Sequence, residues 1–486
     1  MPPHSASHHS RRWLILAVLG LAQLMVVLDA TIVNIALPSA QKALAFSDAN
    51  RQWIVTAYAL AFGSLLLLGG RIGDLFGRKW VFVAGLGGFA IASAIGGAAQ
   101  SFGVLVAARA LQGVFGAMLA PAALSLLTTT FTEPSERNKA FGIFGAIAGS
   151  GAAAGLLLGG ILTEYLSWRW CLYVNLAFAG VAVAGATTLL ENQPHPDKPR
   201  LDLPGTLTAS AGLFALVYGF AHAAQSSWGN ATTLGFLIAG VVLLAVFVAI
   251  QRRVAHPLLP LRVVLDRDRG GSYVAVGLSG IAIFGVFLFL TYYLQQNLGF
   301  TPIKSGLAFL PMTFAIMITA TTVQTQVLPR TGARPLIGTG MLFGAAGMLY
   351  LTGIGVHSGY ASHVLPALIV MGIGFGLIFA PAMSGATLGV APSDAGVASA
   401  MVNTMQQIGG SIGTALLSTL AASATTSYLA GKPHAPAVMA QAAVHGYTTA
   451  FYWSAAIFAV AAVLCTALLR SGVRAPEAVG EPVLAH

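Results

Sequence analysis

The sequence predicts an all-α membrane protein, because of its composition and its long apolar segments. Hydrophobic residues make up 56% of the 486 residues, charged residues make up only 8%, and the mean hydropathy is +0.80. Soluble globular domains carry about three times as many charged residues. Fourteen apolar stretches, each near the length that crosses a bilayer, follow one another with short connections. Because lipid offers the backbone no hydrogen-bond partner, these stretches are expected to be helices.

The predicted spans cover most of the chain between residues 13 and 469. They are Trp13–Leu37, Trp53–Gly70, Trp80–Ala99, Val104–Thr128, Ala140–Leu162, Cys171–Leu190, Leu203–His222, Thr232–Ile250, Ser272–Leu294, Gly306–Val323, Leu336–Ile354, Val364–Met383, Val397–Leu420 and Ala450–Leu469. The first span is too long for the apolar region of a signal peptide and shows no convincing cleavage site. We therefore expect it to stay as a signal anchor.

Basic residues set the expected orientation. With the N-terminus inside, 18 of the 24 Lys and Arg residues fall on the cytoplasmic side, five fall outside and Arg109 lies within a span. This positive-inside bias predicts that both termini are cytoplasmic. The net charge of +10 then reflects topology and contact with anionic membrane lipids. The sequence contains no basic face interleaved with aromatic residues, so nothing in it indicates nucleic-acid binding.

The longest connections divide the chain into two halves. Residues 191–202 and 251–271 bracket spans seven and eight. The predicted organisation is a cytoplasmic tail (1–12), a six-helix bundle (13–190), a linker with two inserted helices (191–271), a second six-helix bundle (272–469) and a second tail (470–486). Secondary transporters are commonly built from two such halves around a central site.

Two charged side chains lie inside the predicted spans, Asp29 and Arg109. A charge at the bilayer centre costs at least about 2.5 kcal/mol, so we expect function to retain this pair. Asp29 lies about 12 Å deep in span one and Arg109 about 8 Å deep in span four, within reach of an arginine side chain. We predict a proton switch, loaded and unloaded by a conformational change that separates the pair. A permanent ion pair that fixes helix packing is the alternative.

Uncharged polar residues in three spans are candidates for a substrate cavity, namely Asn34, Gln112, Asn403 and Gln407. Gln112 follows Arg109 by three residues, on the same helical face. Asn403 and Gln407 are four residues apart in span thirteen and would line the substrate path from the second half. Hydrogen bonding between helices without substrate contact is the alternative.

Glycines mark two further motifs. The loop sequence GRIGDLFGRK between spans two and three contains Gly70, Gly73, Asp74, Gly77, Arg78 and Lys79. Its glycines permit close approach of helix ends and a tight turn, and its basic residues hold that turn at the inner surface. A degenerate echo, PRTGAR at 329–334, follows span ten. Span five carries Gly151, Gly155, Gly159 and Gly160, which form a groove for another helix or serve packing alone.

These motifs together resemble a known family. The loop motif is similar to the signature of the major facilitator superfamily. LDATIVNIALP at 28–38, RALQG at 109–113 and SWRW at 167–170 with Asn175 resemble motifs of its fourteen-helix drug:proton antiporters, the EmrB/QacA type. The likeness covers essentially the whole chain and implies the major facilitator fold, two six-helix bundles plus a two-helix central insert. Leu156 stands where the family usually has proline, so the resemblance does not carry over the kink of span five.

The prediction is a proton-coupled exporter of lipophilic small molecules, such as antibiotics or dyes, working by alternating access in a bacterial plasma membrane. Asp29 accepts the proton from outside, Arg109 tunes it, and Asp74 with Arg78 controls the inner gate. We expect Asp74 to meet the start of span eleven near Arg334; a solvated loop that only sets orientation is the alternative. One proton crossing 100 mV supplies about 2.3 kcal/mol. No cofactor is expected, and a monomer is expected to suffice.

Two other functions stay open. A proton symporter that imports a metabolite would share the fold, and transport assays in inverted vesicles distinguish it. A membrane enzyme acting on lipid-linked substrates should show a cluster of His, Asp or Glu at one membrane face, whereas the 11 histidines are scattered. Cys171 and Cys465 fall in or at the edge of spans, so neither a disulfide framework nor a metal site is indicated.

Overall fold

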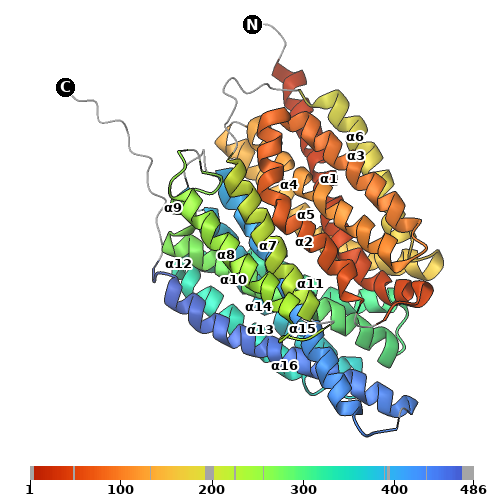
Figure 1. Cartoon of the computed structure of the whole chain (residues 1–486). Helices are drawn as coiled ribbons and strands as arrows, with labels where there is room; N and C mark the ends of the chain where they lie inside the picture. The colour runs from red at the N-terminus through yellow and green to blue at the C-terminus, as the bar shows by residue number, and fades with distance from the viewer. Residues whose placement is uncertain are drawn as a thin grey trace.

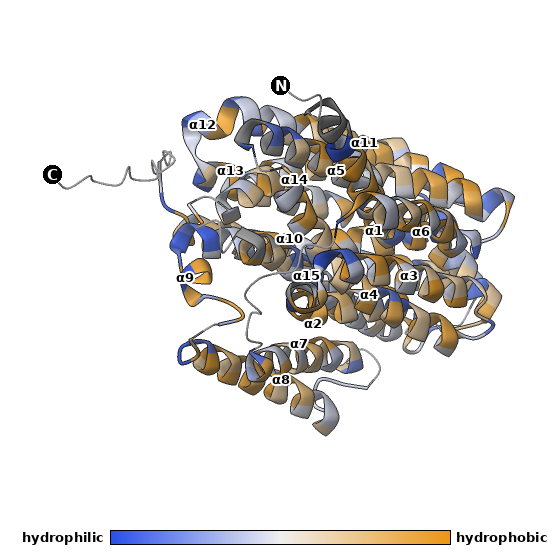
Figure 2. Ribbon diagram, turned by 90° about the horizontal axis from the view of Figure 1, so that it is seen from above, coloured by the Kyte–Doolittle hydropathy of each residue, from blue (hydrophilic) through white to orange (hydrophobic). Residues whose placement is uncertain are grey.

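The computed structural model is helical and without strands over the residues that it describes. These residues are 5–47, 50–131, 133–191, 202–223, 226–255, 257–387, 389–390, 395–433 and 435–472. Eleven helices in this described part are long and apolar enough to cross a membrane. Hydrophobic residues run along nearly all of the long helices in Figure 2. The chain is therefore a multi-pass membrane protein.

The first bundle is built from helices that follow one another in sequence. They are α1 (Ser5–Leu44), α2 (Gln52–Phe76), α3 (Arg78–Gly97), α4 (Phe102–Thr130), α5 (Pro134–Tyr165) and α6 (Trp170–Leu189). Helix α4 packs on α2 and α3, while α1 packs on α5 and α6 and α6 also packs on α3. Figure 1 shows this bundle in red to yellow. The helices that carry the buried polar site therefore all lie within one packed unit.

The second bundle repeats this packing. Its helices are α10 (Arg267–Tyr292), α11 (Pro302–Thr322), α13 (Ala333–Leu351), α14 (Leu365–Thr387), α15 (Ala395–Leu429) and α16 (Pro436–Leu468). Short α-helical turns, α9 (Leu261–Val264) and α12 (Leu328–Thr331), and π-helical segments, η1 (Tyr293–Asn297), η2 (Val323–Val327) and η3 (Tyr360–Val364), flank them. Helix α14 packs on α11 and α13, and α10 packs on α15 and α16. Each pair matches the pair at the same place in the first bundle, as internal structural repeats require.

The two bundles meet along two seams, α2 with α15 and α5 with α11. We call the end of the molecule with Arg78 and Lys79 the basic end, and the other the opposite end. At the opposite end, the Tyr292 hydroxyl donates to Gln41 Oε1 at 2.5 Å, and Ile303 N donates to Glu164 Oε2 at 3.0 Å. Gln295 Nε2 also donates to the carbonyl of Ile35 at 3.1 Å. These bonds join the two bundles, so this conformation is closed at the opposite end.

A helical hairpin covers one of the seams. It consists of α7 (Leu203–Ala223) and α8 (Ala231–Gln251), and α7 packs on both α2 and α15. The Ser210 hydroxyl on α7 donates to the carbonyl of Ser64 on α2 at 2.8 Å. At the base of the hairpin, Asp202 accepts from Gln251 Nε2 at 2.5 Å. Figure 2 shows the hairpin beside α2 and α15, with α5 and α11 on the other side of the molecule.

Candidate functional site

The two charged residues of the predicted spans form an ion pair. Arg109 Nη1 donates to Asp29 Oδ2 at 2.5 Å, and the side chains are 2% and 0% exposed. Asp29 lies on α1 and Arg109 on α4, which pack against each other. The matched depths that the sequence predicts therefore correspond to direct contact. A charge-assisted bond of this length, away from water, is among the stronger hydrogen bonds in proteins.

Two neutral amides complete the hydrogen bonding of the carboxylate. Gln112 Nε2 donates to Asp29 Oδ1 at 3.0 Å, and Asn175 Nδ2 donates to the same oxygen at 2.8 Å. Behind them, Ser93 Oγ on α3 accepts from Gln112 Nε2 at 2.7 Å. All of these side chains are fully buried. With Arg109, they give both carboxylate oxygens of Asp29 a hydrogen-bond donor.

Helix α2 supplies two further contacts of Arg109. Arg109 Nε donates to the carbonyl of Ile54 at 3.1 Å, and the guanidinium carbon lies 4.5 Å from the centre of the Tyr58 ring. Close packing of α4 on α2 depends on Gly113, where an added Cβ would lie 2.9 Å from the backbone nitrogen of Phe62. Arg109 Nη1 also donates to Gln112 Oε1 at 2.8 Å, so the Arg109 charge is held by a carboxylate, an amide oxygen, a carbonyl and an aromatic face.

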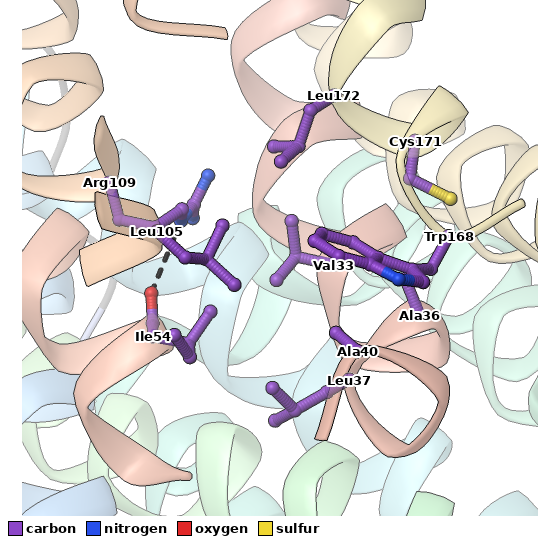
Figure 3. A pocket seen from close by; sticks show the side chains of 10 residues that line it. All are labelled: Val33, Ala36, Leu37, Ala40, Ile54, Leu105, Arg109, Trp168, Cys171 and Leu172. Carbon is purple, nitrogen blue, oxygen red and sulfur yellow. Dashed lines mark hydrogen bonds between the residues drawn. The ribbon is translucent and has the colours of Figure 1, made fainter. Parts of the chain in front are cut away.

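An apolar pocket separates this pair from the loops of the opposite end. Figure 3 shows Arg109 beside it, with the dashed bond to Ile54. Apart from Arg109 its lining is mostly aliphatic and aromatic: Val33, Ala36, Leu37, Ala40, Ile54, Leu105, Trp168, Cys171 and Leu172. Its volume is about 10 Å³, room for one water molecule at most, and such a lining offers a water few partners. The ion pair is thus sealed from this side.

The loop motif forms the turn between α2 and α3. Gly77 has a φ of +91°, a conformation that side chains with a Cβ rarely adopt. Lys79 Nζ donates to the carbonyls of Thr187 and Leu190 at 2.9 and 2.6 Å, which places its charge at the C-terminal end of α6. An added Cβ on Gly70 would lie 3.5 Å from Pro121 Cβ, whereas nothing lies within 4 Å of one on Gly73. Gly73 therefore does not serve a close approach in this conformation.

The charged gate residues of the loop are less fully defined. Arg78 lines a cavity of about 210 Å³ at the basic end, together with Arg11, Arg12, Lys79 and Glu191. The side chain of Asp74 lies outside the described part of the structure. Helix α2 packs on α4, α15 and α7, while α13, which begins at Ala333 beside Arg334, packs on α14 and α16. The gate contact between Asp74 and α13 therefore stays a prediction.

The glycines of α5 pack on two neighbours. An added Cβ would lie 3.1 Å from Val27 Cγ1 at Gly151, 3.0 Å from the Leu28 carbonyl oxygen at Gly155, and 2.9 Å from Ile32 Cγ1 at Gly159. At Gly160 it would lie 2.7 Å from Ile303 Cα of α11. Helix α5 continues without interruption through Leu156, as expected without proline. This motif therefore brings α5 against α1, next to the turn that carries Asp29, and against the second bundle.

The other candidates for a substrate cavity lie apart from the charged pair. Asn34 Nδ2 donates to the Ala30 carbonyl of its own helix at 3.0 Å. Gln407 is half-buried on α15 and faces α2, because a Cβ added to Gly63 of α2 would lie 3.2 Å from Gln407 Cβ. Asn403, also half-buried, lies one turn earlier on α15. Of the four candidates, Gln112 alone bonds to Asp29 in the described structure.

The chain matches a sequence profile over most of its length. The profile of the Major Facilitator Superfamily covers residues 19–414. The chain belongs to this superfamily. It is a secondary transporter rather than an enzyme, in keeping with relatives that are named for antibiotic export and resistance.

Two curated relatives of the superfamily are similar over nearly their whole length. The puromycin resistance protein of Streptomyces alboniger is 51% identical over 97% of this chain and 94% of its own. The cephamycin export protein of Amycolatopsis lactamdurans is 38% identical over 83% of this chain and 84% of its own. A solved peptide transporter of the POT family shares the fold, with a TM-score of 0.67, 17% identity and coverage of 94% of this chain and 96% of its own.

Some residues of the site cannot be predicted from the sequence. Ser93 and the ring of Tyr58 complete it, although neither is singled out by the spacing of residues. The sequence marks Asn175 only as part of a motif, yet Asn175 Nδ2 donates directly to Asp29. The sequence signal for such residues is a polar side chain within an apolar span. This signal does not distinguish them from serines that bond only the backbone of their own helix.

Proposed function

We propose that this chain is a proton-coupled antiporter that exports antibiotics or other lipophilic drugs across a bacterial plasma membrane. The observation that carries the proposal is the buried Asp29–Arg109 pair, an ionisable group in the membrane whose counter-ion is the guanidinium of Arg109. The names of the relatives, which concern puromycin resistance and cephamycin export, support the substrate class. A membrane carboxylate of this kind is a candidate proton relay.

The proposal includes fourteen crossings, the count of the EmrB/QacA type. Helices α1–α6 and α10, α11 and α13–α16 would form the two bundles, and α7 and α8 the insert. Eleven of the described helices meet the length and hydropathy that a span needs. Helix α2 adds the apolar segment Gln52–Leu66 and α5 adds Ala153–Tyr165. With α13 these would complete the set, with the basic end and both termini in the cytoplasm.

We infer a coupling step that the geometry of the site supports. With the opposite end closed, three donors bond the carboxylate oxygens of Asp29 and the apolar pocket keeps water away. Opening toward the outside would separate α1 from its partners and let a proton reach the carboxylate. Neutral Asp29 would no longer hold Arg109, whose charge must then be solvated elsewhere. Drug release outside and proton uptake would thus belong to the same conformation.

The inner gate remains part of the proposal. Asp74, Arg78 and Arg334 would close the basic end when the opposite end opens. Lys79 supports this assignment, because it anchors the start of α3 on the end of α6 and leaves the loop in a fixed position. A monomer has all of these parts.

Transport in everted membrane vesicles tests the proposal. The vesicles are energised to an acidic interior, and puromycin is added while internal pH is followed with a fluorescent amine. Export by exchange predicts that puromycin accumulates inside and that the pH gradient falls, only when the protein is present. Accumulation that continues after the pH gradient is collapsed would favour a channel. Accumulation that requires the reverse gradient would favour a symporter.

A further inference from the structure

Helix α2 carries buried polar side chains that have no use in the Asp29 site. Gln52 is 0% exposed, and among the described residues neither its amide nitrogen nor its amide oxygen has a hydrogen-bond partner. Thr56, one turn further, is also 0% exposed and its hydroxyl has no partner. A buried amide without partners is costly, because it has lost its water and gained nothing in exchange.

Helix α15 carries a matching stripe. The hydroxyls of Ser411, Thr414 and Ser418 are buried and have no partner among the described residues. Their spacing of three and four residues places them on one face of the helix. Thr404, two turns before Ser411, has the same unpartnered hydroxyl on the same face.

The two stripes face each other across the α2–α15 seam. Gly63 of α2 lies opposite Gln407 of α15, since a Cβ added to Gly63 would lie 3.2 Å from Gln407 Cβ. The helices run antiparallel, since α2 begins and α15 ends at the opposite end of the molecule (Figure 1). Two turns toward that end from Gly63 lies Thr56, and two turns from Gln407 lies Thr414. Helices in this register place the polar atoms of both stripes in one layer.

The α5–α11 seam shows that contact between the two bundles does not require buried polar groups without hydrogen-bond partners. On α11, the Ser305 hydroxyl donates to the Thr301 carbonyl at 3.0 Å, and the Thr313 hydroxyl donates to the Phe309 carbonyl at 3.5 Å. Glycines, such as Gly160, make the contact between α5 and α11. The α2–α15 seam is also the one that α7 covers, which shields its polar layer from lipid.

We propose that the polar layer formed by Gln52, Thr56, Ser411, Thr414 and Ser418 is a hydrogen-bonding subsite for the exported substrate. When the opposite ends of the bundles part, these groups line the release path and bind neutral hydroxyl and amide groups. The five side chains carry no charge, so they select for neutral polar groups and contribute little to a purely apolar cation. The inference rests on the proposed function and adds the part of the substrate that the seam recognises.

Paired substitutions at one position test the subsite. Thr414→Val removes the hydroxyl and keeps the shape, whereas Thr414→Ser keeps the hydroxyl. Puromycin, which carries hydroxyl and amide groups, is compared with tetraphenylphosphonium, which carries none. We expect Thr414→Val and Gln52→Leu to raise the apparent KM for puromycin efflux about tenfold, the loss of one hydrogen bond. The apparent KM of Thr414→Ser for puromycin should stay near that of wild type. Efflux of tetraphenylphosphonium should be unchanged in Thr414→Val and in Gln52→Leu.

Controls separate this inference from its basis. Ser454→Ala on α16 removes a buried hydroxyl that bonds its own helix, and should leave both substrates unaffected. Wild-type KM values for puromycin in Thr414→Val and Gln52→Leu, or a parallel loss of both substrates at equal membrane abundance, would overturn the subsite and leave the exporter intact. If wild type exports neither compound, the proposed function itself fails. If wild type exports puromycin but not tetraphenylphosphonium, the difference in apparent KM for puromycin between Thr414→Val and Thr414→Ser tests the subsite.

Discussion

Single residues determine where charge is held in this membrane protein. Asp29 has three donors on its two oxygens, and Arg109 has a carboxylate, an amide oxygen, a backbone carbonyl and an aromatic ring. Each partner thus compensates the other. Removing one charge leaves the other buried without its counter-ion, which is more damaging than removing both.

A double-substitution experiment follows at this scale. Arg109→Gln and Asp29→Asn should each lower thermal stability in detergent, with Arg109→Gln costing about 3–5 kcal/mol because Asp29 loses its cation. The double variant should be more stable than Arg109→Gln alone, since no charge remains buried. Drug export should be absent in all three. Additive losses of stability would show that the pair is not coupled.

The sequence predicts the pair and Gln112 beside it, but not the rest of the surroundings. Asp29 and Arg109 stand out because they are the two charges in the spans, and their depths can be counted along each helix. Ser93 and Tyr58 cannot be found in this way, because their contacts depend on how α3 and α2 rotate about their axes. Asn34 shows the same limit, since it bonds its own helix although it lies near Asp29 in sequence.

Helices and turns are where sequence patterns predict most reliably. The apolar stretches correspond to helices, but α1 begins at Ser5 and continues through Pro38 to Leu44, well beyond the predicted span. The echo at 329–334 has a structural counterpart, because Gly332 between α12 and α13 has a φ of +75° and Gly77 between α2 and α3 has a φ of +91°. Both bundles therefore turn at a glycine in the same place.

Glycine substitutions test this turn. Gly77→Ala should destabilise the protein by about 1–2 kcal/mol, because a Cβ disfavours positive φ. Gly332→Ala should behave alike. Gly73→Ala, in a helix with nothing within 4 Å, should be neutral or slightly stabilising. Thermal unfolding of purified protein measures all three, and an equal loss at Gly73 would refute the distinction.

At the scale of the whole molecule, two bundles close on each other at the opposite end. Contacts of Gln41 with Tyr292 and of Glu164 with Ile303 join elements more than 100 residues apart in sequence. Helical periodicity gives the buried face of each helix but not which helix faces which, so these pairs could not be predicted. Alternating access requires them to break.

Cross-linking tests that requirement. Glu164→Cys with Ile303→Cys, in a background of Cys171→Ser and Cys465→Ser, places two thiols across the α5–α11 seam. A short cross-linker attached to both thiols through disulfide bonds should stop drug export, and reduction of those disulfides should restore it. Glu164→Cys alone should export normally after the same treatment. Full export by the cross-linked pair would mean that this end does not open during transport.

Drug-driven proton movement by Asp29→Asn tests the central claim most directly. Wild type and Asp29→Asn are reconstituted at equal density in vesicles with an inside-acid gradient, and puromycin accumulation and internal pH are followed together. The buried proton switch predicts that wild type exchanges drug for protons, while Asp29→Asn still binds drug but neither accumulates it uphill nor consumes the gradient. Uphill accumulation by Asp29→Asn with an unchanged dependence on pH would contradict the switch.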